Sequence, residues 1–152
     1  MRELQSKSVV STETSDKKFF CCIWIDKDHF VTSAGSEVCV WSTKQENPVS
    51  MLDTGSSQNV TILASKLSSK GRFSIAAASA NMCFFFKLNF SKELKTVLSS
   101  SQLKLEATEK FFDVRITSNT TLSIVYGSIF NITKKSVELT EGLCDLTKKT
   151  HN

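Results

Sequence analysis

The chain has 152 residues and a formal net charge of +4, with 40% apolar and 22% charged residues. This size and balance predict one domain with a hydrophobic core and exclude collagen, a coiled coil and a fully disordered chain. Eleven phenylalanines, a single proline and many Ser and Thr residues favour strands over helices. The composition therefore predicts an all-β protein.

Short apolar segments separated by turn-forming residues continue this pattern along the chain. Residues 1–18 are polar, and a short edge strand is expected there only at Val9-Val10. Four strands are then predicted between turns, at 19–25, 29–33, 37–42 and 49–52. Together they form a first unit, near 19–54.

The same order returns twice. A second unit near 59–98 has strands at 60–67, 73–79, 82–88 and 93–98, and a third near 111–139 has strands at 111–116, 122–126, 129–132 and 137–139. We expect residues 92–110 to form a loop with one strand in it, and residues 140–152 to form a tail.

The recurrence itself predicts an architecture. An aromatic residue falls near the end of each third strand, at Trp41, Phe86 and Phe130, with separations of 45 and 44 residues. Small residues precede the tight turns, among them Gly35 and Gly127. A four-stranded unit with a period near 45 is typical of a β-propeller blade, so residues 19–139 are predicted to form about three antiparallel blades. A β-sandwich or barrel has the same strand density but gives no reason for the recurrence.

Aromatic residues are the first candidates for a binding site. The run Phe84-Phe85-Phe86, with Trp24 and Trp41, could form a stacking platform for single-stranded RNA. Burial on both faces of a packed blade explains the run without RNA, because adjacent side chains in a strand point to opposite faces. We favour the core interpretation and assign Trp41 to the groove between blades.

Residues with catalytic or metal-binding chemistry are sparse. Asp26, Asp28 and His29 form the one cluster of suitable composition, and a solvated turn explains it better than a calcium or acid–base site. The five cysteines lack C-x-x-C spacing and are predicted to be free thiols. We therefore predict no catalytic residue, metal or cofactor, and a protein that is not an enzyme.

Residues 34–42 resemble the closing half of a WD repeat, in which a turn leads into a strand that ends in Trp-Asp. Here Ser42 replaces the Asp, the second unit ends in Phe86-Lys87, and no unit opens with a Gly-His pair. The hydrogen-bond network of the consensus repeat is therefore missing. The resemblance implies a WD-repeat-type β-propeller with divergent blades.

The third unit carries a more specific resemblance. Residues 123–130, Ser-Ile-Val-Tyr-Gly-Ser-Ile-Phe, and residues 137–139 are similar to the last part of the propeller in one nucleolar family. That family is the WD-repeat subunit of the transcription-coupled U-three-protein complex of the small-subunit processome. The resemblance implies a scaffold for pre-ribosomal RNA transcription and processing, with other WD-repeat subunits as partners and indirect contact with pre-ribosomal or small nucleolar RNA. It also implies a nucleolar location, with the cytoplasm as the alternative.

Two other functions fit the sequence. A WD-repeat adaptor in another pathway would have protein partners and no small nucleolar RNA. A secreted β-sandwich would use the N-x-[ST] triplets at Asn59, Asn89, Asn119 and Asn131, but no signal peptide is recognisable. No apolar stretch reaches membrane-spanning length, so no membrane contact is expected. Because propellers close with about four to eight blades, the chain is expected to be a fragment of a longer product. The alternatives are a propeller completed by another copy or a partner, and a fold that is not a propeller.

Overall fold

A computed structural model describes residues 19–69, 72–91, 94–118, 120–139 and 142–145 of the chain. These residues form strands and loops without a helix, which confirms the all-β prediction. The strands are β1 (Phe19–Trp24), β2 (His29–Ala34), β3 (Glu37–Ser42), β4 (Ser50–Asp53), β5 (Ile62–Ser69), β6 (Arg72–Ala78), β7 (Met82–Ser91), β8 (Leu94–Lys104), β9 (Lys110–Ile116), β10 (Thr121–Gly127), β11 (Ile132–Glu138) and β12 (Gly142–Asp145). The edge strand expected at Val9-Val10 lies outside the described residues.

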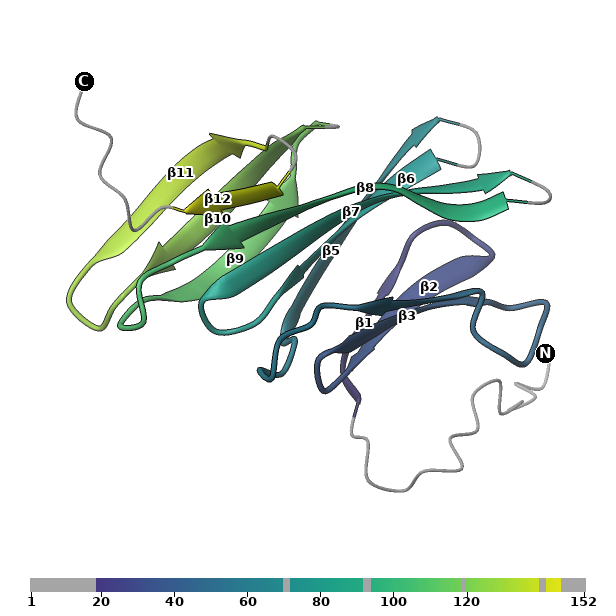
Figure 1. Ribbon diagram of the computed structural model, residues 1–152, viewed down its shortest axis with the longest axis horizontal. Coiled ribbons are helices and arrows are strands. Elements are labelled where there is room, and N and C mark those ends of the chain that lie inside the picture. The colour runs from purple at the N-terminus through teal and green to yellow at the C-terminus, as the bar shows by residue number, and fades with distance from the viewer. Residues whose placement is uncertain (1–18, 70–71, 92–93, 119, 140–141, 146–152) are drawn as a thin grey trace, which may run out of the picture.

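The strands form three sheets, which lie side by side with sheet B in the middle (Figure 1). Sheet A has the order β1-β2-β3-β4, and sheet C has the order β11-β10-β9; both are antiparallel. Sheet B has the order β12-β8-β7-β6-β5, in which β12 runs parallel to β8 and the other pairs are antiparallel. Sheet A and strands β5 to β8 of sheet B thus match the first two predicted four-stranded units.

Sheet B is covered on both faces, and strand β7 shows how. Phe84 and Phe86 belong to the core between sheets A and B, while Phe85 belongs to the core between sheets B and C. All three side chains are buried. The alternation of a strand therefore assigns the aromatic run to two separate cores, as the core interpretation predicted.

Small residues stand opposite these large rings. Phe84 pairs with Ala77 on β6, and Phe85 pairs with Ala76 on one side and Ser101 on the other. A row of large side chains between rows of small ones lets adjacent sheets approach closely without voids. This explains both the alanine run in β6 and the serine run in β8.

The two end sheets differ in their burial. In the middle of β2 and β3, side chains on both faces of sheet A are buried. Sheet C buries one face against sheet B through Leu122 and Ile124, whereas the opposite face carries polar residues such as Arg115, Ser123 and Ser136. Sheet C is therefore amphipathic, as expected for a sheet with one solvated face.

The third unit differs from its prediction in register. Residues 129–132 were predicted as a third strand, yet residues 128–131 form the turn between β10 and β11. Strand β11 instead covers Ile132–Glu138, which absorbs most of the predicted fourth strand at 137–139. Among the described residues sheet C thus has three strands, and the prediction of a four-stranded third blade was wrong.

One further strand was not predicted, and another is longer than predicted. Residues 142–145 of the predicted tail form β12, which pairs with the outer strand of sheet B. Residues 94–104 form the single long strand β8, which extends well into the predicted loop. Strand β12 depends on pairing with β8, which lies far from it in the sequence, so local composition does not reveal it.

Candidate functional site: a cleft at the first strands of the three sheets

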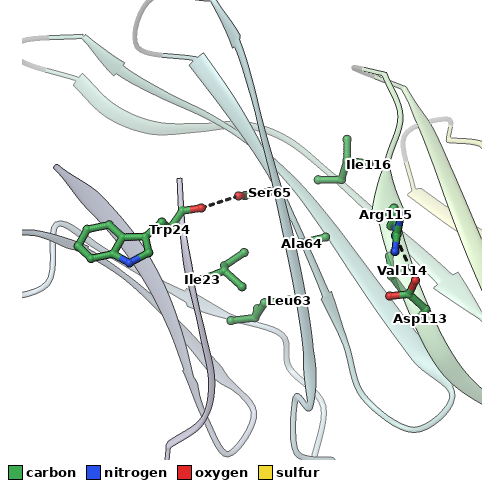
Figure 2. A pocket seen from close by; sticks show the side chains of 9 residues that line it. All are labelled: Ile23, Trp24, Leu63, Ala64, Ser65, Asp113, Val114, Arg115 and Ile116. Atoms are coloured by element: carbon green, nitrogen blue, oxygen red, sulfur yellow. Dashed lines mark hydrogen bonds and ion pairs between the residues drawn. The ribbon is translucent and has the colours of Figure 1, made fainter. Parts of the chain in front are cut away.

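The first strand of each sheet in chain order is also an edge strand, and these three edges meet. Strand β5 contacts both β1 and β9. A cleft of about 500 Å³ opens where they converge (Figure 2). Its lining consists of Ile23, Trp24, Leu63, Ala64, Ser65, Asp113, Val114, Arg115 and Ile116. Each sheet therefore contributes its first strand to one shared site.

Side chains of β5 join the three edges. The Ser65 hydroxyl donates a hydrogen bond to the Trp24 carbonyl at 3.2 Å, and the Lys66 ammonium donates one to the Thr117 carbonyl at 2.8 Å. Edge strands present unpaired backbone carbonyls, and these bonds satisfy one on β1 and one just after β9. The two exposed bonds therefore connect β5 to β1 and to the residue that follows β9.

Both apolar and polar residues line the open cleft, and polar atoms make up more than half of its exposed surface. Leu63 and Val114 are buried in the two cores, whereas Trp24 is 61% exposed. At the rim, Arg115 Nε lies 3.2 Å from Asp113 Oδ2. Edge strands with a mixed lining and an exposed aromatic ring suit binding of an extended peptide.

Two of the predicted repeat residues occupy equivalent places. Trp41 pairs with Phe30 on the second strand of sheet A, and Phe86 pairs with Ile75 on the second strand of sheet B. Phe86 packs between sheets A and B. Trp41 lies on the face of sheet A that points away from sheet B, because the adjacent Val40 belongs to the core between sheets A and B. On that outer face its ring stacks on Phe30, with ring centroids 6.2 Å apart. Both side chains are buried, and neither lines the cleft.

The third predicted repeat aromatic, Phe130, is not in a strand or a core. It lies in the β10–β11 turn and is 85% exposed, so its assignment to the repeat was wrong. The cause is the preceding Gly127, which ends β10 and allows the chain to turn: an added Cβ there would overlap the Asn131 backbone. Gly35 forms the expected tight turn between β2 and β3, with φ of 60°.

The acidic cluster near residue 26 forms a turn. Asp26 Oδ1 accepts hydrogen bonds from the backbone N–H groups of Asp28 and His29, both at 2.8 Å, and lies 3.0 Å from His29 Nδ1. Burial alone raises the pKa of Asp26, but the donors at Asp28 and His29 outweigh it, so the pKa is lowered. The described residues contain no group of three His, Cys, Asp or Glu side chains arranged to hold a metal.

Four cysteines, Cys21, Cys22, Cys39 and Cys83, are free thiols in different environments. Cys21 packs against the core between sheets A and B, whereas the adjacent Cys22 is exposed, as alternation predicts. Burial raises the pKa of Cys21, partly offset by its contact with Ser33. Cys83 is completely buried, and burial raises its pKa to about 12. A buried thiol with a raised pKa, such as that of Cys83, is inert in the folded protein.

The sequence singled out one residue of the cleft, Trp24, but the core interpretation favoured for it was wrong, because its side chain is exposed. The residues of the cleft come from strands that were predicted, but no motif marks them, and the ion pair of Asp113 and Arg115 looks like ordinary strand surface. The cleft could have been predicted only from the order of the strands, because it is built from the first strand of each unit.

Comparisons with known proteins bear on the fold. No protein-family model matches the chain, and no curated protein matches it in sequence. Among solved structures it is similar to a protein of unknown function from Bacteroides caccae, with a TM-score of 0.50 and 8% identity. The match covers 86% of this chain and 50% of that protein, so the chain spans about half the length of its structural neighbour. The likeness concerns the arrangement of strands. Within the described residues no helix has the length and hydrophobicity needed to span a membrane.

Proposed function

We propose that the chain is part of a WD-repeat-type β-propeller that acts as a non-catalytic interaction scaffold. The observation that carries this proposal is the meeting of β1, β5 and β9 at one cleft, with each sheet extending away from it. Propeller blades are arranged in this way, with their first strands around a central axis. A β-sandwich gives no reason for the first strand of every unit to reach the same place.

The packing of sheet B adds support. It buries one face on sheet A and the other on sheet C, as an internal blade does between its neighbours. The matching registers of Trp41 and Phe86 also agree with repeated units. Sheet C departs from the pattern, because its described strands number three and its outer face is polar.

The biological setting we propose is small-subunit ribosome biogenesis in the nucleolus. Its basis is the sequence similarity of residues 123–130 and 137–139 to the WD-repeat processome subunit. In this setting the partners are other WD-repeat subunits, and contact with pre-ribosomal or U-three small nucleolar RNA is indirect. The cleft, with three edge strands and the exposed ring of Trp24, would receive an extended segment of a partner.

The test is purification of the tagged chain from its own cells, followed by probing for U-three RNA and mass spectrometry of bound proteins. The variant Trp24→Ala/Arg115→Ala removes the cleft rim, and Met51→Ala, at a 62% exposed residue outside the cleft, is its matched control. We expect U-three RNA and WD-repeat proteins with the wild type and the control, and their loss with the cleft variant. Partners without that RNA would instead assign the chain to an adaptor in another pathway.

A further inference from the structure

Strand β11 forms a long open edge at the end of the molecule away from sheet A (Figure 1). It pairs with β10 on one side, and no described strand pairs with its other side. The outer edges of the other two sheets, β4 and β12, have four residues each, whereas β11 has seven. Short edge strands resist pairing with another chain, so the long open edge of β11 is where such pairing is expected.

Alternate residues of β11 direct their backbone groups to this open side. Just beyond the strand, the Leu139 N–H donates to the Thr120 carbonyl at 2.7 Å, and the bond from the Ser128 N–H to the Asn131 carbonyl at the other end has the same phase. In an antiparallel pair, residues bonded to the neighbouring strand alternate with residues that face the other way. Counting back from Leu139, the residues whose N–H and C=O groups point to the open side are Ile132, Lys134, Ser136 and Glu138.

The two faces of β11 leave room for another strand. Residues 132–136 are all exposed, both those on the face toward sheet B and those on the opposite face, and within β11 Val137 alone is buried. Sheet C also has three described strands where sheet A and β5–β8 have four, and the vacant place of the fourth is beside β11. An added strand would therefore extend sheet C without displacing any described residue.

Lys134 and Glu138 carry opposite charges on the same face of β11. They are four residues apart, so about 13 Å of extended strand separates them and they cannot pair with each other. Neither forms an ion pair with another described residue, in contrast to Asp113 and Arg115 on β9, which pair with each other. The open edge therefore offers one positive and one negative group to another chain.

A second copy of β11 offers the complementary charges in one register. If two β11 strands pair antiparallel about Lys134 or Lys135, that lysine stands opposite its own copy, which is unfavourable. Pairing about Ser136 instead places Lys134 opposite Glu138, and by symmetry Glu138 opposite Lys134. Residues that point to the open side then face each other, so a backbone ladder forms, and Lys135 faces the uncharged Val137.

We propose that two copies of the chain associate by antiparallel pairing of their β11 strands, centred on Ser136. The two copies of sheet C then form one continuous sheet, in which each β11 gains the neighbour that it lacks. The contact is isologous, so association stops at a dimer. The inference goes beyond the scaffold function, because dimerisation is measured on the purified chain without ribosomal RNA or any partner.

The experiment is analytical ultracentrifugation of the purified full chain over a wide concentration range. We expect the wild type to pass from monomer to dimer as concentration rises, without larger species. Lys134→Glu and Glu138→Lys each place like charges opposite each other at both symmetric positions, so each should lower the association constant about tenfold. Lys135→Glu makes the same charge change at the adjacent residue, which faces Val137, and should associate like the wild type.

Mixing the two charge variants is the decisive measurement. When a Lys134→Glu copy pairs with a Glu138→Lys copy, both facing charge pairs again have opposite signs. The mixture should therefore dimerise at least as tightly as the wild type, although each variant alone dimerises weakly.

Ser136→Pro tests the backbone ladder itself. The N–H of Ser136 points to the open side, so proline removes a bond between copies and leaves the bonds between β10 and β11 in place. The variant should stay monomeric, and circular dichroism checks that it and the charge variants retain their strands.

A wild type that stays monomeric at several hundred micromolar overturns the proposal, as does a mixture of the charge variants that forms no dimer. A wild-type dimer that persists unchanged in Ser136→Pro overturns it too, since the contact would then lie elsewhere. Loss of association in Lys135→Glu as large as in Lys134→Glu would indicate a general effect of charge and contradict the register.

Discussion

The indole N–H of Trp41 donates a hydrogen bond of 2.8 Å to the hydroxyl of Thr32, and both side chains are buried. Trp41 is 4% exposed, so water cannot replace this acceptor. The bond also connects β2 and β3 across the outer face of sheet A, beside the stacked rings of Phe30 and Trp41. A tryptophan in this environment depends on its partner as well as on its packing.

We therefore expect Thr32→Val to destabilise the fold. Valine fills nearly the same space but leaves the buried indole N–H without an acceptor, which costs about 1–3 kcal/mol of unfolding free energy. Urea denaturation measures the change. Thr108→Val, at an exposed position in the β8–β9 loop, should change stability by less than about 0.5 kcal/mol. Equal effects of the two substitutions would show that the hydrogen bond contributes nothing.

Gly127 is required by its neighbours. A Cβ at this position would overlap the backbone of Asn131, and backbone atoms cannot move aside as a flexible side chain can. Gly127→Ala should therefore disrupt the β10–β11 hairpin and destabilise the protein by more than about 1 kcal/mol.

Gly55 is the matched control for this substitution. It has φ of 71° but no atom within 4 Å of an added Cβ, so Gly55→Ala meets conformational strain alone. That strain costs about 1–2 kcal/mol. Thermal melts of both variants compare the two costs. A smaller loss at Gly127 than at Gly55 would contradict the predicted overlap.

The features of the fold that the sequence predicts are those set by neighbouring residues, and the features it misses depend on contacts between distant segments. Alternation over two residues placed Phe84, Phe85 and Phe86 correctly, because adjacent side chains in a strand take opposite faces whatever the fold. The turn at Gly35 was also predictable, since its backbone conformation favours glycine.

The third unit shows where this reasoning fails. Ile129 and Phe130 look like strand residues by composition, and a period near 45 placed Phe130 with Trp41. The hairpin register, which pairs Gly127 with Ile132, leaves both side chains in the turn. The cleft and the parallel pairing of β12 with β8 arise from contacts between distant segments, so no local pattern could reveal them.

The turn around Asp26 makes stability depend on pH. The pKa of Asp26 is lowered in the folded state, so the unfolded chain binds its proton more readily. The stabilisation is complete above the unfolded pKa of about 4 and is lost as pH falls through the lower folded pKa. Asp26→Asn should weaken this acid dependence below about pH 4, as measured by chemical denaturation at several pH values. Asp53→Asn is the control and should leave the dependence of the unfolding free energy on pH as it is in the wild type. The same dependence in Asp26→Asn as in the wild type would contradict the prediction.

The thiols should differ sharply in reactivity. Cys22 is exposed and should react with iodoacetamide in the folded protein, whereas Cys83 is fully buried with a pKa of about 12. Modification of Cys83 therefore requires unfolding and should accelerate with urea, in step with loss of structure. Peptide mass spectrometry follows each site, and Cys22→Ser removes the rapid signal. Rapid labelling of Cys83 under native conditions would show that the core between sheets B and C opens locally.

Phe85 should be the side chain on which the contact between sheets B and C depends most. It is 2% exposed and packs with Leu103, Leu122 and Ile124 in a core to which both sheets contribute. Phe85→Ala should lower the unfolding free energy by about 3–5 kcal/mol, through lost apolar burial and the cavity that remains. Phe85→Leu fills most of that cavity and should recover a large part of the loss.

Phe112 is the matched control for Phe85. It is 46% exposed at the bulge between β9 and β10, so Phe112→Ala should cost less than about 1 kcal/mol. Hydrogen exchange locates the effect: in Phe85→Ala, protection should fall in β9 and β10 before it falls in β2 and β3, because sheet A packs on the opposite face of sheet B. Simultaneous loss of protection in all three sheets would mean that they unfold as one unit and that the core between sheets B and C has no stability of its own.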